Sequence, residues 1–131
     1  KFARDNGKRL PTLDEWRTAA GLYKTNDNYF DDNESPREYA NVYDLVSSSK
    51  DTYTKTAPVG KFSPNKNNLY DLVGNVEEWC IGSGNTPTRV GGHYGTKESR
   101  SRSFRLKTHK EDYTSDKLGF RCVVDVDTLL K

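Results

Sequence analysis

The sequence predicts a loop-rich α+β domain with one or two short helices and short antiparallel strands. A capping box opens an amphipathic helix near the start of the chain, and alternating apolar and polar residues near its end are typical of strands. Long stretches rich in Asn, Asp, Ser and Lys separate these elements. With 131 residues, 32% of them apolar and 31% charged, the chain has room for one modest core. We therefore expect a single domain over residues 1–131.

Both expected helices lie near the start of the chain. Residues 1–6, followed by Gly7, are typical of the last turns of a helix that ends at a glycine. Thr12 and Glu15 have the spacing of a capping box, which starts a second helix that ends before Gly21. The apolar residues that would share its buried face are Leu13, Trp16 and Ala20.

The middle of the chain predicts little regular structure. Residues 23–41 are rich in Asn, Asp and Glu without a sustained period, which indicates a solvated loop. Residues 41–68 indicate irregular structure with one or two brief strands. Side chains alternate in character along 100–106 and, after Gly119, along 120–126, so both segments are predicted to be strands.

Charge and apolar content exclude some classes of protein. The net charge of +2 gives no reason to expect a nucleic acid or an anionic membrane as partner, and no apolar run is long enough to span a bilayer. A nucleic-acid role would rest only on a local basic stretch, and no recognised module supports it. This stretch contains the single acid Glu98 and six cationic residues, namely Lys97, Arg100, Arg102, Arg105, Lys107 and Lys110.

Five sequence motifs together carry a family resemblance. They are RLPTLDEW at 9–16, TAPVGKF at 56–62, NLYDLVGNVEEW at 68–79, the Gly91-Gly92 pair and GFRCV at 119–123. In order and spacing they resemble the formylglycine-generating-enzyme family, also called the sulfatase-modifying-factor family. The resemblance implies a variant of the C-type lectin fold.

The resemblance runs over residues 8–124 and matches only the later part of the family's domain. We therefore expect the family's N-terminal strands to be missing. In the lectin-like fold the first strand pairs with the last, here residues 118–126, and without its partner that strand would have an exposed edge. The favoured explanation is that the chain is a fragment of a longer protein, and the alternative is a strand supplied by another segment or subunit.

The resemblance also bears on catalysis. Family members that modify sulfatases bind Cu(I) through two cysteines that follow the paired glycines. The corresponding positions here are Thr96 and Ser101, and His93 replaces the serine that usually follows the glycines. Because Cu(I) selects thiolates, these hydroxyls imply a non-catalytic member without copper. Iron bound by His93 and His109 is a weaker alternative, since the histidine ligands of iron-dependent relatives come from a separate, earlier domain.

Two calcium sites are implied by the same resemblance. The first consists of the Asn41 side chain, the Val42 carbonyl, the Asp51 side chain and the Tyr53 carbonyl. The second consists of Asp71, the carbonyls of Gly74 and Val76, and Glu78. Carboxylate, amide and carbonyl oxygens are the ligands that Ca²⁺ prefers. The alternative is that Asp71 and Asn75 only hydrogen-bond the backbone of a turn.

The remaining motif residues have structural interpretations. We expect Trp79 to anchor the core against the last strand, as Trp16 does from the helix. Cys80 and Cys122 are either buried thiols or one disulfide that closes a 42-residue loop. Such a disulfide would contribute about 3 to 4 kcal/mol in the chain-entropy model.

The favoured function is non-catalytic binding of a protein or other surface ligand through residues 93–116, in an exported or surface-exposed protein. One version resembles the variable proteins of diversity-generating retroelements, which vary this stretch. The alternatives are a structural envelope lipoprotein of a gliding or secretion machine, a formylglycine-generating oxidase, or an ordinary solvated loop at 93–116. The expected contact residues mix aromatic and guanidinium groups: His93, Tyr94, Thr96, Arg100, Arg102, Phe104, Arg105, His109 and Tyr113.

Overall fold

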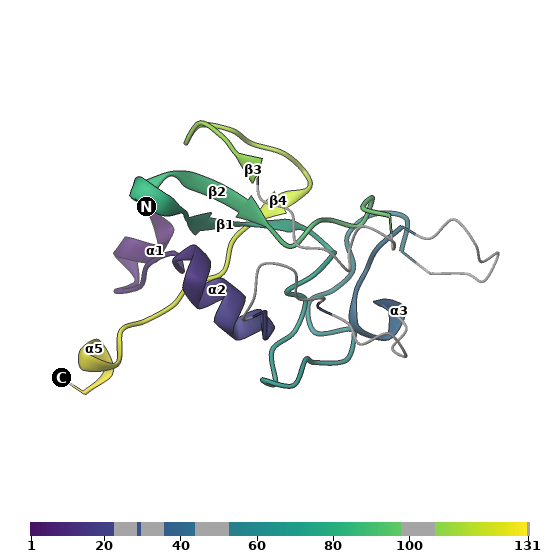
Figure 1. Cartoon of the computed structure of the whole chain (residues 1–131), viewed down its shortest axis with the longest axis horizontal. Coiled ribbons are helices and arrows are strands. Elements are labelled where there is room, and N and C mark those ends of the chain that lie inside the picture. Colours follow the sequence, from purple (N-terminus) through teal and green to yellow (C-terminus); the bar gives the residue numbers. More distant parts are fainter. Residues whose placement is uncertain (23–28, 30–35, 44–52, 98–106, 131) are drawn as a thin grey trace.

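The computed structural model combines short helices with one small sheet, which confirms the predicted α+β class (Figure 1). It describes residues 1–22, 29, 36–43, 53–97 and 107–130. The helices are α1 (Phe2–Asp5), α2 (Leu13–Ala20), α3 (Pro36–Tyr39) and α5 (Val126–Leu129). The strands are β1 (Glu77–Ile81), β2 (Pro87–Val90), β3 (Lys107–Thr108) and β4 (Leu118–Gly119), with a 3-10 turn at Ser83–Asn85 between β1 and β2.

Helix α2 begins and ends as its sequence predicts. The backbone N–H of Glu15 donates to Thr12 Oγ1 at 3.2 Å, and the N–H of Thr12 donates to Glu15 Oε2 at 2.7 Å, so the capping box is complete. Gly21 ends the helix in the left-handed region at φ 77°. Arg9 donates two hydrogen bonds to the Glu15 carboxylate, and this contact, with the capping bonds, lowers the pKa of Glu15 to about 2.

The sheet has the strand order β3-β2-β1-β4. Strands β1 and β2 form an antiparallel hairpin in which Trp79 lies opposite Arg89, and β3 adds antiparallel to β2 with Lys107 opposite Arg89. Strand β4 pairs in parallel with β1, where Leu118 lies opposite Glu77. The sequence did not predict the β1–β2 hairpin. The charged and apolar residues of this hairpin show no pattern that distinguishes them from the loop motif that precedes them.

The end of the chain differs from the strand expected over 120–126. Regular pairing is limited to β4, and Val123 then forms an isolated antiparallel bridge with Arg9 through two backbone hydrogen bonds of 3.0 and 2.8 Å. Residues from Val126 onward turn into helix α5 instead. The apolar alternation therefore marks a segment that pairs only briefly, and the strand expected over 100–106 lies outside the described residues.

The middle of the chain is mostly irregular, as expected, with one correction. The sequence predicted residues 23–41 as loop, but they contain helix α3. Pro36 is the first residue of this helix, a position where proline is compatible with helical structure. Within the described residues of 41–68 there is no strand of the sheet, and the extended pairing seen there is an isolated bridge between Tyr43 and Lys97.

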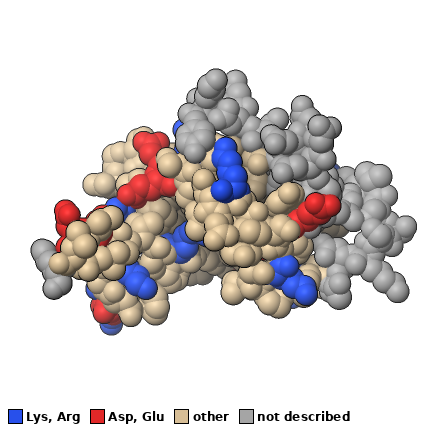
Figure 2. Space-filling view, turned by 90° about the horizontal axis from the view of Figure 1, so that it is seen from below, with Lys and Arg blue, Asp and Glu red and all other residues tan. Residues whose placement is uncertain are grey.

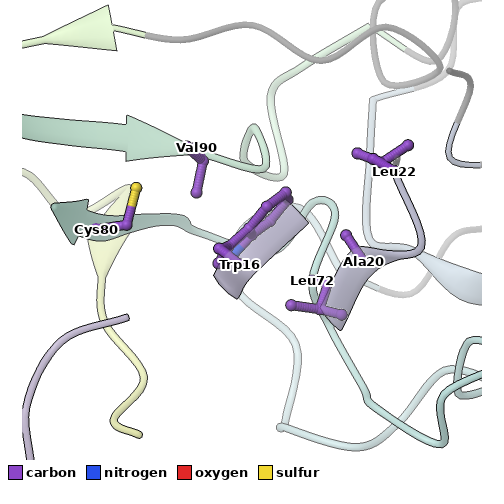
Figure 3. Packing of buried hydrophobic residues seen from close by; sticks show 6 residues of the cluster. All are labelled: Trp16, Ala20, Leu22, Leu72, Cys80 and Val90. Carbon is purple, nitrogen blue, oxygen red and sulfur yellow. The ribbon is translucent and has the colours of Figure 1, made fainter. Parts of the chain in front are cut away.

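The main core lies between α2 and the sheet (Figure 3). Side chains alternate along a strand, so Cys80 of β1 and Val90 of β2 point to the same face and meet Trp16 of α2. The cluster consists of Trp16, Ala20, Leu22, Leu72, Cys80 and Val90. Trp16, at 1% exposure, is the core anchor that the sequence predicted.

Trp79 does not belong to this core, which corrects the second predicted anchor. Along β1 the alternation gives the α2 face to Glu78 and Cys80, and the opposite face to Glu77 and Trp79. Trp79 is accordingly only half-buried. In Figure 1, α2 lies on one side of the sheet and the segment between β3 and β4 on the other, so the sheet separates a helix-packed face from a loop-covered face.

A buried asparagine ties the loops to the edge of the sheet. Asn75 Oδ1 accepts from the Ala57 N–H at 2.8 Å and from Asn41 Nδ2 at 3.2 Å, while its Nδ2 donates to the Ala57 carbonyl. The Asn75 carbonyl accepts from the Tyr94 N–H at 2.9 Å. Gly74 precedes it at φ 77°, and a Cβ there would lie 2.5 Å from the Asn41 carbonyl oxygen. This network fixes the start of the loop that carries Tyr94.

Candidate functional site

The loop-covered face of the sheet is built around a buried ion pair. Arg89 of β2 donates from NH1 to Glu77 Oε2 of β1 at 2.6 Å, and the two side chains are only 7% and 6% exposed. Lys107 of β3 reaches the other carboxylate oxygen at 3.1 Å and is 49% exposed. The three residues lie on adjacent strands, so the pairing register itself brings them together. Two cations thus share one buried carboxylate.

Two aromatic rings cover the Arg89 guanidinium. Its NH2 group is hydrogen-bonded to His109 Nε2, and its central carbon lies 4.4 Å from the centre of the Tyr113 ring. The His109 and Tyr113 rings pack at 4.3 Å. An arginine always donates, so His109 Nε2 must accept, and the ring carries its proton on Nδ1. The segment after β3 is therefore fixed to the sheet by cation–π and hydrogen-bond contacts.

The paired glycines open the neighbouring turn. Gly91 has φ 91°, and a Cβ there would lie 2.5 Å from the Leu72 carbonyl oxygen, so only glycine fits. Thr96 closes the turn, since its hydroxyl accepts from the His93 N–H at 2.9 Å and its N–H donates to the His93 carbonyl at 2.7 Å. His93 Nδ1 accepts from the Gly95 N–H at 3.0 Å. The turn thus presents His93 and Tyr94 with defined backbone geometry.

Tyr94 joins this turn to the segment before β4. Its hydroxyl donates to Asp116 Oδ2 at 3.3 Å, and Lys117 Nζ lies 5.5 Å from the centre of its ring. The His93 and Tyr94 rings meet edge to face at 5.8 Å. Lys117 in turn accepts a backbone hydrogen bond from the Glu77 N–H, so both halves of the site meet at β1.

His93 is kept neutral by its surroundings. Burial lowers the pKa of His93 below its ordinary value of 6.5, and the cations Lys117, Lys107 and Arg89 act in the same direction, while Glu77 opposes them. Since Nδ1 accepts from Gly95, the ring proton lies on Nε2. His93 therefore presents a neutral N–H donor.

The structure brings together the predicted contact residues that it describes. His109 and Tyr113 pack on Arg89, while His93, Tyr94 and Thr96 form the adjoining turn. The other predicted contacts, and the second position implied for copper, lie outside the described residues; they are Arg100, Arg102, Phe104, Arg105 and Ser101.

Sequence reasoning missed the residues that organise this site. Glu77, Arg89 and Lys117 were not predicted as site residues, and Lys107 was predicted only as part of the basic stretch within 93–116, although each contributes charge to the site. The only signal for Glu77 and Arg89 is weak, since each charged residue has one apolar neighbour, Val76 and Val90 respectively. On the face shown in Figure 2, Lys and Arg are dispersed between acidic and uncharged side chains.

The helix-packed face holds a second buried charge network, at the predicted second calcium site. Arg121 donates from Nε and NH2 to the two oxygens of Glu78, each at 2.7 Å. Trp16 Nε1 also donates to Glu78 Oε2, at 2.9 Å. Both oxygens of Glu78 are therefore occupied, and its charge is neutralised by Arg121.

Asp71 is the better cation ligand of the predicted set. Its Oδ2 accepts from the Gly60 N–H at 2.7 Å, while its buried Oδ1 has no hydrogen-bond partner among the described residues. The carboxylate borders a cavity of about 530 Å³ that is also lined by Val76, Glu78 and Arg121. An unsatisfied buried carboxylate oxygen favours a cation nearby. Calcium at this site remains a prediction, and its support among the described residues is the unpaired Oδ1 of Asp71.

The first predicted calcium site is described only in part. Asn41 is 1% exposed and uses its Nδ2 to donate to the Lys55 carbonyl and to Asn75 Oδ1. Val42 is buried and Tyr53 is half-buried, whereas Asp51 lies outside the described residues. Within the parts of the chain that are described, no cluster of three or more His, Cys, Asp or Glu residues forms a metal centre. This site also remains a prediction.

Replacing Asp71 tests the second calcium site. In the unchanged chain, calcium at 100 times its dissociation constant is expected to stabilise the fold by about 2.7 kcal/mol relative to chelator. Asp71→Ala is expected to lose the part of this stabilisation that the second site contributes, so its melting temperature should differ less between calcium and chelator. Asp71→Asn keeps an acceptor for Gly60 but removes the charge, so it should lose the same part of the calcium effect. Calorimetry that finds the unchanged chain insensitive to chelator would overturn the prediction.

Both cysteines are free thiols in the structure, so the alternative of a disulfide is not formed here. Cys80 lies in the core, and burial raises the pKa of its thiol to about 11. Cys122 is half-buried near the end of the chain. A buried thiol of raised pKa stays protonated at neutral pH and reacts slowly.

Comparison with known proteins places the chain in a family. Residues 1–126 match the family described as "Sulfatase-modifying factor enzyme 1-like domain". A formylglycine-generating enzyme of Streptomyces coelicolor is 32% identical over 155 residues, which cover 96% of this chain and 49% of that protein. The chain belongs to the sulfatase-modifying-factor family, and the predicted resemblance is confirmed.

Two further similarities involve proteins of other descriptions. An inactive C-alpha-formylglycine-generating enzyme 2 of Bos taurus is 33% identical, with 88% of this chain and 44% of that protein covered. Treponema denticola variable protein 1 has a TM-score of 0.65 and 28% identity, over 88% of this chain and 46% of that structure. The chain spans about half the length of the curated relatives it matches. No helix among the described residues is long and apolar enough to cross a membrane.

Proposed function

We propose that this chain is a non-catalytic binding module of its family and that residues 93–116 contact the ligand. The observation that carries the proposal is the role of Thr96. At a position where the family resemblance implies a copper-binding thiolate, this residue uses a hydroxyl to close a turn with His93. A Thr hydroxyl stays protonated at neutral pH and is a poor ligand for Cu(I). The site therefore keeps the family's scaffold without the group that would carry the oxidation.

The chemistry of the surrounding surface supports binding. His93, Tyr94, His109 and Tyr113 place four partly buried rings beside Arg89 and Lys117. Aromatic and guanidinium groups held in fixed positions lose little entropy on binding and dominate the affinity of many interfaces. The similarity to a protein named as inactive and to one named as variable is compatible with this role.

A finer version of the proposal is that residues 93–116 are diversified by a retroelement. Its support is the structural similarity to a variable protein of Treponema denticola. The version predicts a second, template copy of the corresponding coding sequence beside the gene, differing from it at adenines. Sequencing the flanking DNA tests this point without affecting the broader proposal.

Two assays test the broader proposal. In the first, the protein is incubated with Cu(I), oxygen and a cysteine-containing sulfatase peptide, with the S. coelicolor enzyme as positive control. We expect no conversion of the cysteine, and turnover would overturn the non-catalytic assignment.

The second assay measures binding. A panel of peptides and glycans is screened by NMR, and the backbone signals of Tyr94 and Tyr113 are expected to shift with a binding ligand. Tyr113→Ala is then expected to weaken binding of that ligand about tenfold or more, because the aromatic ring that contacts the ligand is lost. Phe2→Ala is the matched control, since Phe2 is a 62% exposed aromatic residue on α1. Shifts confined to other surfaces, or equal effects of the two variants, would contradict the proposal.

A further inference from the structure

We propose that the binding surface recognises an oxyanion, such as a carboxylate or sulfate group of the ligand, between His93, Lys107 and Lys117. The inference rests on the proposed function and specifies the chemistry of the ligand. It is carried by the charges that the fold gathers at this face.

Two cations, Arg89 and Lys107, form ion pairs with the single carboxylate of Glu77. Glu77 is the acid shared by Arg89 and Lys107, and both of its oxygens are used, by Arg89 NH1 and Lys107 Nζ. One carboxylate cannot neutralise two cations, and Arg89 Nε is also buried without an acceptor among the described residues. This half of the site therefore retains positive charge beside the exposed part of Lys107.

Lys117 adds a further cation, which has no salt bridge to a carboxylate among the described residues. Its Nζ lies over the Tyr94 ring at 5.5 Å. Asp116 lies next to it in the chain but accepts its hydrogen bond from the Tyr94 hydroxyl. Direct contacts connect these groups: Tyr94 packs on His93 and under Lys117, and Glu77 binds both Lys107 Nζ, through its carboxylate, and the Lys117 carbonyl, through its backbone N–H. In keeping with this placement, the charges of both lysines lower the pKa of His93. Among the described residues, the charges that act on His93 are thus three cations and one anion.

His93 completes the site with a neutral donor. Gly95 occupies its Nδ1, so its Nε2–H is available, and no described residue accepts from it. A neutral donor between two lysines binds an anion without adding to the repulsion between the cations. The Tyr94 ring packs against His93 and under Lys117, so it excludes some water from this position and strengthens the attraction to a charged group.

Sulfate is the probe for the first experiment because it remains a dianion throughout the pH range of a histidine titration. The His93 ring signals are followed by NMR from pH 5 to 8 in sodium sulfate and in sodium chloride of equal ionic strength. A bound anion favours the imidazolium, so we expect sulfate to raise the pKa of His93 relative to chloride. Equal titration curves in the two salts would overturn the inference, since screening alone depends on ionic strength.

Lysine variants locate the effect. Lys117→Gln and Lys107→Gln are each expected to weaken sulfate binding about tenfold, whereas Lys61→Gln, an exposed lysine that does not act on His93, should leave it unchanged. Repeating the titration with acetate distinguishes a site for carboxylates from one that needs a dianion. Equal binding by Lys117→Gln and the unchanged chain, at unchanged melting temperature, would also overturn the inference.

The two proposals can fail separately. If sulfate has no effect on His93 while Tyr113→Ala still weakens a ligand from the screen, the anion inference is wrong and the binding surface stands. If Tyr113→Ala has no effect on any ligand but sulfate binds beside Lys117, the surface binds anions and the wider contact with residues 93–116 is wrong.

Discussion

Replacing Glu78 with alanine is expected to lower the free energy of unfolding by about 3 to 5 kcal/mol, which is a large part of the stability of a domain this size. The side chain of Glu78 is 8% exposed and accepts from Arg121 and Trp16. Its removal takes away both carboxylate hydrogen bonds of the Arg121 guanidinium, which is 28% exposed, and the hydrogen bond that the indole N–H donates to Glu78. Urea unfolding followed by tryptophan fluorescence measures the change.

Matched variants separate the charge from the packing at this position. Glu78→Gln keeps an acceptor for Trp16 Nε1 but loses the charge that Arg121 requires, so its loss should be smaller than that of Glu78→Ala. Asp125→Ala removes an exposed carboxylate that also binds an arginine, Arg9, and should change stability little. Equal losses for Glu78→Ala and Asp125→Ala would show that burial of the ion pair does not determine its contribution.

The elements that the sequence predicted well are those encoded by local rules. Thr12 and Glu15 form the capping box, Gly21 ends α2, and Trp16 anchors the core. These features were predictable because each depends on residues a few positions apart in the sequence. The predictions failed for elements whose formation depends on pairing with strands far away in the sequence. Strand β1 exists because it lies between β2 and β4, and nothing within Glu77–Ile81 alone indicates those partners.

The sequence predicted the stretch of the candidate site and the aromatic and cationic character of its residues, but not the contacts that hold them together. The resemblance directed attention to residues 93–116, and the described contacts His109 and Tyr113 do lie together. What could not be predicted is that Arg89, which lies outside the five motifs, holds both rings to the sheet. The reason is the strand register, which places Arg89 beside Lys107 and within reach of Glu77. One sequence does not disclose that register.

Glu77→Ala is expected to produce the second large effect, because it leaves Arg89 buried and unpaired. We expect the free energy of unfolding to fall by about 3 to 5 kcal/mol, whereas Lys107→Ala should cost about 1 kcal/mol or less, since Lys107 is half-exposed. Chemical denaturation of both variants measures the difference. Similar losses would indicate that Lys107, and not Arg89, is the principal partner of Glu77.

A double substitution tells whether this ion pair serves stability or the binding surface. Glu77→Leu with Arg89→Met removes both charges and keeps apolar volume on the sheet, so it should recover much of the stability lost in Glu77→Ala. The same variant removes the guanidinium that holds His109 and Tyr113. A variant that regains stability but not ligand binding would assign the Glu77–Arg89 pair to positioning the surface. Recovery of both would mean that the two rings hold their positions without Arg89.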